Sequence, residues 1–157
     1  MQITGLSKFI RSFSYLLVCI GWLLPLSADE SVGNDTTLQL VVEGVQRSQG
    51  HIIVGVFACE ASYDEGENPK MHAMLPAQPR QGKVKYTFRG LPAGSYAIKL
   101  FHDINDNQKL DSNWLGIPRE PFGFSNNPRI RFGPPDFDTA RFTVVAGESH
   151  RQLVILN

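Results

Sequence analysis

Cysteine is nearly absent from this chain, which has 157 residues and only two cysteines, Cys19 and Cys59. Cys19 lies within an N-terminal apolar run, so the rest of the chain has one thiol and cannot form an internal disulfide. The folded part must therefore be stabilised by a hydrophobic core, which a chain of this length can build. Cys59 ends an apolar stretch, and we expect it to be buried, because free cysteine is among the most buried residue types.

An excess of positive charge is also missing, because 15 Lys and Arg residues are balanced by 15 Asp and Glu residues. The small basic cluster of Arg80, Lys83 and Lys85 has the spacing of a solvated strand face. Nothing resembles the basic stripe of a nucleic-acid-binding protein, so no nucleic-acid partner is expected.

Motifs of familiar catalytic sites are missing as well. Ser125 lacks the Gly-x-Ser-x-Gly turn of a nucleophilic serine, and the other histidines are scattered without metal-ligand spacing. His102 and Asp103 would have to complete a triad with Ser125, but neighbours on a strand point to opposite faces. We therefore expect a protein without catalytic activity. The alternative is an accessory hydrolase that uses His102, Asp103 and Ser125.

A long apolar run occurs only at the N-terminus. Lys8 and Arg11 precede an apolar stretch at residues 13–24, and Ala28 then meets acidic sequence. This pattern predicts a secretory signal peptide at residues 1–28, and hence a periplasmic or secreted protein. A membrane span needs about 20 apolar residues, so none is expected after signal cleavage. Loss of Lys8 and Arg11 would leave 13 basic against 15 acidic residues, a net charge near −2.

The remaining sequence is dominated by strand patterns. Residues 29–36 are polar and predict a disordered leader, and residues 37–157 predict a single domain. Residues 38–43 and 51–58 predict two strands that pair as a hairpin or lie close together. Residues 71–75 have helical spacing and predict one short helical turn. Further alternating stretches predict strands at residues 83–88, 96–101, 141–145 and 152–156. This pattern predicts an antiparallel β-sandwich with an Ig-like or transthyretin-like layout.

One long segment, residues 103–140, interrupts the strand pattern. It is rich in Gly, Pro and Asn but also in aromatic residues, which favours an ordered loop packed against the sandwich, with a short strand at residues 129–132. Its aromatic residues have two interpretations: plugs that hold the loop in place, which we favour, or a surface that binds sugars, peptides or a membrane component. The candidate binding residues are Trp114, Phe122, Phe124, Asn126 and Asn127.

The same segment begins with regularly spaced oxygen-bearing side chains. Asp103, Asn105, Asn107 and Asp111 occupy positions 1, 3, 5 and 9 of an EF-hand-type calcium loop, with the Lys109 carbonyl at position 7. Position 6 is Gln108 rather than Gly, and position 12 is Trp114 rather than Glu. The sequence therefore predicts either a weak Ca²⁺ site or a turn in which Asn and Asp bond their own backbone.

Several blocks resemble known families. Residues 90–96, running into residues 101–103, are similar to the turn-and-strand signature of transthyretin-like and carboxypeptidase-regulatory-like modules. A family of exported bacterial proteins, domain of unknown function 2141, resembles this chain in the blocks FHDINDN (residues 101–107), LGIPRE (115–120), FGFSNN (122–127) and FGPP (132–135). Where that family usually has Gly, this chain has Gln108. The resemblance implies an exported β-sandwich without an assigned reaction.

These observations together predict an exported, non-catalytic binding or structural module of the bacterial envelope. Its ligand or protein partner in the envelope is not identified by the sequence. Calcium is the one cofactor that the loop pattern suggests, with no cofactor as the alternative.

Overall fold

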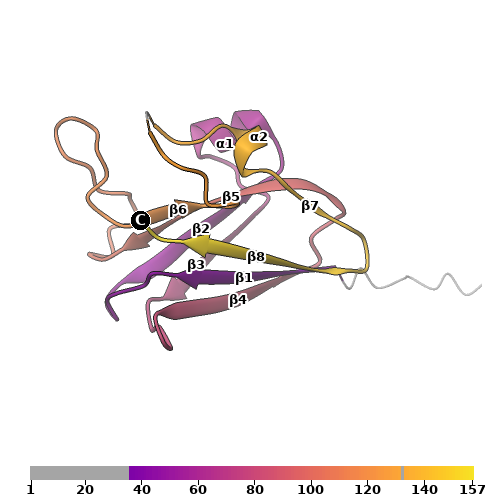
Figure 1. Ribbon diagram of the computed structural model, residues 1–157, viewed down its shortest axis with the longest axis horizontal. Coiled ribbons are helices and arrows are strands. Elements are labelled where there is room, and N and C mark those ends of the chain that lie inside the picture. Colours follow the sequence, from indigo (N-terminus) through magenta and orange to yellow (C-terminus); the bar gives the residue numbers. More distant parts are fainter. Residues whose placement is uncertain (1–35, 132) are drawn as a thin grey trace, which may run out of the picture. The chain divides into compact units, whose positions relative to one another are not determined.

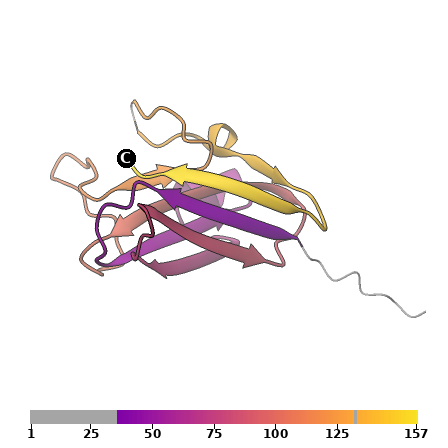
Figure 2. The same ribbon diagram turned by 60° about the horizontal axis from the view of Figure 1, so that its bottom comes forward.

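The computed structural model describes residues 36–131 and 133–157 and confirms the predicted β-sandwich (Figures 1 and 2). The predicted signal peptide and residues 29–35 of the predicted leader lie outside the described residues. A three-stranded sheet has the order β4-β1-β8, and a five-stranded sheet has the order β3-β2-β5-β6, with β7 also paired to β5. The three-stranded sheet consists of β1 (Thr37–Glu43), β4 (Lys83–Arg89) and β8 (Ser149–Ile155). The five-stranded sheet consists of β2 (His51–Phe57), β3 (Met71–Pro76), β5 (Gly94–Asp103), β6 (Phe122–Phe124) and β7 (Phe142–Val144).

The main core lies between the two sheets. Every second residue of a strand points inward, and these positions are apolar in the central strands of both sheets. Burial of this apolar surface is the dominant favourable contribution to folding. The innermost side chains include Leu38, Leu40 and Val42 of β1, Ile52, Val54 and Val56 of β2, and Ile98 and Leu100 of β5.

A second, smaller core lies on the outer face of the five-stranded sheet. Two short helices, α1 (Glu60–Glu65) and α2 (Phe137–Ala140), cover part of this face (Figure 1). Tyr63 of α1 packs edge-on against Phe57 of β2 and Phe137 of α2, with ring centroids 5.8 and 5.7 Å away. The helices do not cover the β5–β6 end of this face. The long loops lie there, and they carry the candidate site.

The strand pairing adds two points to the expectation. Of the two arrangements predicted for β1 and β2, the hairpin does not form, because β4 and β8 occupy both edges of β1 and β2 lies in the other sheet. The sandwich is also not wholly antiparallel, since β1 and β8 run parallel. The physical reason is that β7 pairs with β5, so residues 145–148 carry the chain across to the other sheet before β8 begins.

Three local expectations were wrong. Residues 71–75 form the edge strand β3 rather than a helical turn, because Ala73 and Leu75 alternate into the core. Cys59 is exposed rather than buried, since it lies beyond the end of β2 and caps α1. Thr36, expected in the disordered leader, is buried, and its carbonyl accepts the backbone N–H of Gly90 at 3.0 Å.

Candidate binding site on the long loops

Two loops rise from the β5–β6 end of the five-stranded sheet, on the face that α1 and α2 partly cover (Figure 1). The first, residues 104–121, joins β5 to β6, and the second, residues 125–136, joins β6 to α2. We refer to them as the β5–β6 loop and the β6–α2 loop. Both loops belong to the long segment at residues 103–140 that the sequence predicted, although residues 129–131 form no strand in the described structure.

The start of the β5–β6 loop is held by Asp103. This carboxylate is almost completely buried and accepts the backbone N–H groups of Asn107 at 3.1 Å and of Gln108 at 2.7 Å. A buried carboxylate needs such partners, because an unpaired buried charge is strongly unfavourable. Asp103 therefore fixes the curl of the loop through its own backbone.

The end of the same loop is held by Glu120, a residue that the sequence analysis did not single out. Its buried carboxylate accepts the backbone N–H of Ile104 at 2.8 Å and that of Asp111 at 3.0 Å. Glu120 thereby joins the two ends of the loop. No motif in the sequence marks it, because the acceptor role depends on backbone groups far along the loop.

The predicted calcium ligands come together in one hydrogen-bonded network. The amide groups of Asn105 and Asn107 donate to the two carboxylate oxygens of Asp111, at 2.7 and 3.0 Å. The side-chain oxygen of Asn107 accepts the backbone N–H of Lys109 at 2.8 Å. The described residues contain no group of three or more His, Cys, Asp or Glu side chains placed to hold a metal ion. For Ca²⁺ to bind, both amides would have to turn their oxygens toward Asp111, so calcium stays a prediction.

The tip of the β5–β6 loop is a tight turn that displays Trp114. Asn113 organises it: its side-chain oxygen accepts the N–H groups of Leu115 and Ile117, at 2.9 and 3.0 Å. A backbone bridge between Ser112 and Pro118 closes the base of the turn. Trp114 is 89% exposed, so our preference for a buried plug was wrong at this position. We call residues 113–118 the Trp114 turn.

An apolar groove of about 560 Å³ lies between the two loops. Phe122 and Phe124 form its floor, Leu110 and Ile117 line it from the β5–β6 loop, and Ile130 lines it from the β6–α2 loop. Arg131 is the one charged residue among the described residues that line it. The sequence identified the two phenylalanines, but not the aliphatic residues, which have no periodic pattern in a loop.

Gly123 explains why both phenylalanines reach this face. They are separated by one residue, so they share a side of β6, and Gly123 points to the opposite side, toward β8. A Cβ atom at position 123 would lie 2.7 Å from the carbonyl oxygen of Ile155. Glycine therefore lets β6 approach β8 closely while Phe122 and Phe124 face the groove. Phe124 is buried, as expected of a plug, and Phe122 is half-buried.

The groove continues into a second hollow of about 320 Å³ over β2 and β5, which shares Leu110, Phe122 and Phe124 with it. Lys99 lines this hollow, donates a hydrogen bond to the carbonyl of Tyr63 and lies 4.0 Å from the centre of the Tyr63 ring. Burial lowers the pKa of Lys99 below its ordinary value, and the nearby carboxylate of Asp64 partly opposes this shift.

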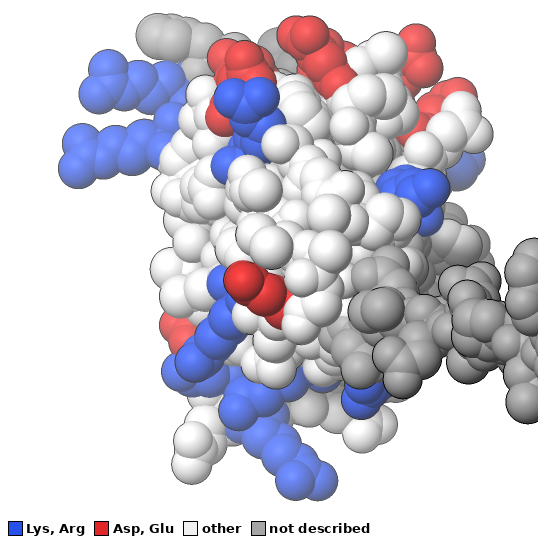
Figure 3. Space-filling model, turned by 90° about the vertical axis from the view of Figure 1, so that its right-hand side faces the viewer, with Lys and Arg blue, Asp and Glu red and all other residues white. Residues whose placement is uncertain are grey.

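Acidic side chains lie on α1, the helix that contacts Lys99. Acidic side chains gather at the top of Figure 3, the side on which α1 and α2 lie in Figure 1. Glu60, Asp64 and Glu65 all belong to α1. The Asp64 carboxylate of α1 therefore interacts with Lys99 at this hollow, whereas the groove is lined mainly by apolar side chains.

The predicted binding residues Asn126 and Asn127 both form hydrogen bonds within the fold. The amide of Asn126 donates to the carbonyls of Thr139 and Arg141, at 3.1 and 2.8 Å. Asn127 bonds β8 through its amide to the Leu153 carbonyl, at 3.0 Å, and through its oxygen to a backbone N–H, at 2.7 Å. Both residues attach the β6–α2 loop to its neighbours.

The three residues of the hydrolase alternative have partners in the backbone. The Ser125 hydroxyl is fully buried, accepts the N–H of Ile98 at 2.8 Å and donates to the Ala140 carbonyl. One ring nitrogen of His102 lies 2.7 Å from the carbonyl oxygen of Gln49. Asp103 holds the loop as described above. In the described structure these groups contact backbone rather than one another.

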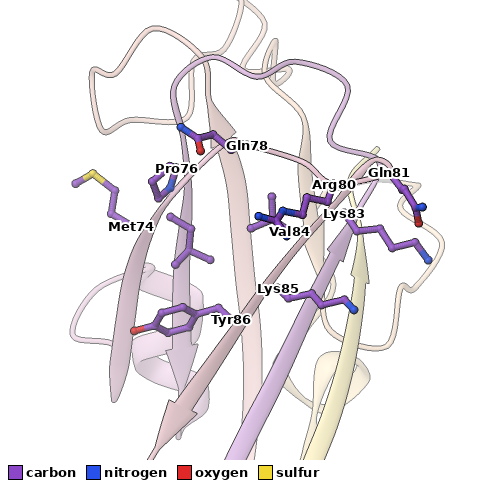
Figure 4. A pocket seen from close by; sticks show the side chains of 10 residues that line it. Met74, Pro76, Gln78, Arg80, Gln81, Lys83, Val84, Lys85 and Tyr86 are labelled. Atoms are coloured by element: carbon purple, nitrogen blue, oxygen red, sulfur yellow. The ribbon is translucent and has the colours of Figure 1, made fainter.

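A further hollow of about 720 Å³ lies between the edge strands β3 and β4. In Figure 4, Tyr86 points toward β3, whereas Lys83 and Lys85 point away from it, over the outer face of the three-stranded sheet. Lys83 pairs with Glu43 of β1 at 2.6 Å. These lysines therefore belong to the solvated strand face that the sequence predicted, and together with Arg80 they line the rim of this hollow.

The fold and the loops define a β-sandwich protein whose candidate site is an apolar surface on two long loops. Neither helix within residues 36–131 and 133–157 has the length and apolar character needed to cross a membrane. The chain belongs to the family described as "Uncharacterized protein conserved in bacteria (DUF2141)", whose model matches residues 40–152. No curated protein and no solved structure matches the chain. The family confirms the resemblance carried by the loop blocks.

Proposed function

We propose that this protein is an exported, non-catalytic binding module of the bacterial envelope that holds an uncharged apolar ligand in the groove between its two long loops. The observation that carries the proposal is the groove of about 560 Å³ floored by Phe122 and Phe124. Ligand sites are typically concave, mostly apolar and of this size. The apolar N-terminal run supports export, because its flanks have the pattern of a signal peptide.

The alternative, an envelope hydrolase using His102, Asp103 and Ser125, has less support. A nucleophilic serine needs an exposed hydroxyl within hydrogen-bond reach of a base. The Ser125 hydroxyl is buried between two backbone groups. A mechanism through this residue would require the β6–α2 loop to open.

Titration with a neutral naphthylamine dye, which fluoresces in apolar surroundings, tests the groove. We expect saturable binding that is weakened about fivefold or more in Leu110→Gln and Ile117→Gln, because each exposed side chain contributes apolar contact area to the ligand. Leu153→Gln is the control, since Leu153 lies on the three-stranded sheet and is about as exposed as Leu110. Binding that is unsaturable, or unchanged in both groove variants, would contradict the groove assignment.

Export is tested separately. The protein expressed with its native N-terminus should be recovered from the envelope fraction, with a mass that corresponds to cleavage near Ala28. Full-length protein recovered from the cytosol would contradict the export part of the proposal.

A further inference from the structure

The sandwich is closed along one side and open along the other. On the closed side, Asn127 bonds β8, and the N–H of Asn157 donates to the Phe122 carbonyl of β6 at 3.0 Å. On the open side, β3 and β4 are the edge strands of their sheets, and the hollow of about 720 Å³ lies between them (Figure 4). In the part of the chain that the structure describes, no strand pairs with the outer edge of either. Such an edge is completed by another extended chain.

The outer edge of β3 has two residues whose backbone groups are free. The N–H of Ala77, just after β3, donates to the Gly50 carbonyl, just before β2, at 3.0 Å. Hydrogen-bonded positions alternate along an antiparallel pair, so Met74 and His72 turn their N–H and C=O groups away from β2. Pro76 has no N–H, and its carbonyl accepts a backbone N–H of the following turn at 2.7 Å. The free edge of β3 therefore offers two donors and two acceptors.

The two edge strands differ in their protection against pairing with another chain. Free edges of natural sheets are usually protected by charged side chains. Three of the seven residues of β4 are Lys or Arg, whereas β3, with the sequence MHAMLP, has no Lys, Arg, Asp or Glu. The backbone of Lys83, at the start of β4, is also bridged to Arg80. The β3 edge is therefore the one that can accept a further strand.

The residues that line the hollow favour an acidic partner. They include three cations, Arg80, Lys83 and Lys85, and no Asp or Glu. Lys83 pairs with the neighbouring Glu43 carboxylate at 2.6 Å, whereas Arg80 and Lys85 form no ion pair in the described structure. Three cations against one carboxylate leave the rim of the hollow positive, so the rim attracts carboxylates.

A second copy of this chain fits the rim less well than an acidic peptide does. A copy that paired through its own β3 would add a strand without Asp or Glu, so the rim cations would stay without a partner. Leu75, Val84 and Tyr86 line the hollow between the strands and provide contacts for apolar side chains. An extended peptide with an apolar centre and acidic ends matches the edge, the hollow and the rim together.

We propose that the β3 edge binds an extended acidic peptide, which adds one strand to the five-stranded sheet. The peptide backbone bonds the free N–H and C=O groups of His72 and Met74, and its apolar side chains enter the hollow. Its acidic residues lie beside Arg80 and Lys85. This inference goes beyond the proposed groove function and does not depend on it.

The probe is a fluorescein-labelled octapeptide with a Thr-Val-Thr-Val centre and two Glu residues at each end, titrated with the full chain. We expect saturable binding in fluorescence anisotropy. Met74→Pro removes an outward N–H and no bond to β2, and proline is tolerated at such edge positions, so the fold is kept. Binding should weaken about tenfold or more, whereas Met74→Thr, the matched control that keeps the N–H, should bind within about twofold of the parent. Equal binding by the two variants overturns the strand pairing.

The charge assignment has its own arm. A peptide with Lys in place of every Glu should bind about tenfold more weakly, and Arg80→Glu should weaken binding of the Glu peptide by a similar factor. Arg151→Glu is the matched control, since Arg151 is exposed on β8, the far edge of the three-stranded sheet. Equal binding of both peptides, or equal weakening in the two arginine variants, overturns the acidic-peptide assignment.

Hydrogen exchange locates the peptide without any substitution. Saturating peptide should slow the exchange of the His72 and Met74 N–H groups about tenfold or more. The N–H of Thr87, which faces away from β1 by the same alternation on β4, should stay unprotected. Protection of Thr87 instead, or of neither edge, overturns the β3 assignment. A dimer that protects His72 and Met74 without peptide would assign the edge to a second copy and overturn the proposal. Binding of the naphthylamine dye by Met74→Pro should be unchanged, which separates this test from that of the groove.

Discussion

The carboxylate of Asp103 accepts the backbone N–H of Gln108 at 2.7 Å, and Gln108 holds this bond with a φ of 60°. The left-handed region costs a residue with a side chain about 1–2 kcal/mol, whereas glycine adopts it freely. Part of the gain from glycine is offset by the greater entropy of the unfolded chain. Gln108→Gly should therefore stabilise the protein by about 0.5–1 kcal/mol in urea unfolding.

Gln108→Ala is the control for this prediction. Alanine removes the same side chain but keeps the strain of a positive φ, so it should give no stabilisation. Equal effects of glycine and alanine would show that the side chain, rather than the backbone conformation, determines the stability at this position.

The calcium prediction concerns the same loop. If Asp103, Asn105, Asn107 and Asp111 bind Ca²⁺ with a dissociation constant near 1 mM, about 10 mM Ca²⁺ should stabilise the protein by roughly 1.4 kcal/mol. The melting temperature should then rise by about 4–7 °C, and Mg²⁺ should do much less. A melting temperature equal in calcium and in chelator would leave only a turn built from Asn and Asp.

Two variants locate the calcium effect. Asp111→Ala removes the carboxylate at the centre of the network and should abolish the rise. Asp106→Ala loses the contact to His51, so it should lower the melting temperature in both conditions but keep most of the calcium-dependent difference. Loss of that difference in Asp106→Ala alone would contradict the predicted ligand set.

Tyr63 provides a prediction about stability and pH. Its hydroxyl is buried without a hydrogen-bond partner in the described structure, and burial, with Asp136 and Asp64 nearby, raises the pKa of its phenol. Tyr63→Phe should therefore stabilise the protein by about 1 kcal/mol at neutral pH, because an unpaired buried hydroxyl is costly.

The direction in which alkaline pH changes the stability follows from the difference between the pKa of Tyr63 in the folded and in the unfolded chain. Above about pH 10 an unfolded chain releases the tyrosine proton while the folded protein retains it, so stability falls as pH rises. Lys99 acts in the opposite direction, since burial lowers its pKa. Between pH 9 and 11, the melting temperature of the parent should therefore include a decline caused by Tyr63, and this decline should be absent from the melting temperature of Tyr63→Phe. Parallel pH profiles of the parent and the variant would contradict this assignment.

Neighbouring residues of β5 should differ in their contribution to stability. Leu100 points into the main core and is 2% exposed, whereas Phe101 lies half-exposed on the opposite face. Leu100→Ala should cost about 2–5 kcal/mol, and Phe101→Ala only about 1 kcal/mol despite the larger side chain removed. Equal losses of unfolding free energy would contradict the assignment of these faces.

The strand faces could be predicted because alternation is a local property of the sequence. Leu38, Leu40 and Val42 of β1 show it clearly. Residues 71–75 were misassigned because their apolar residues fit both the helical period and the strand period. The parallel pairing of β1 with β8 depends on contacts between residues more than 100 positions apart, which no local pattern encodes.

The candidate site could be predicted only in part. The spacing of Asp103, Asn105, Asn107 and Asp111 correctly placed these residues in one curled loop. The exposure of Trp114 was missed, because an aromatic residue in a Gly- and Pro-rich loop is usually a packing residue. Its display depends on Asn113, whose side chain bonds two backbone groups of a turn that sequence patterns do not describe.

The most direct test of the proposed function is an NMR titration of the isotope-labelled protein with the neutral naphthylamine dye. Amide shifts should concentrate at residues 110–118, 122–124 and 130–131, around the groove. They should be small in β1 and β4. Shifts centred on the hollow between β3 and β4, or spread evenly over both sheets, would contradict the assignment of the groove between the long loops as the binding site.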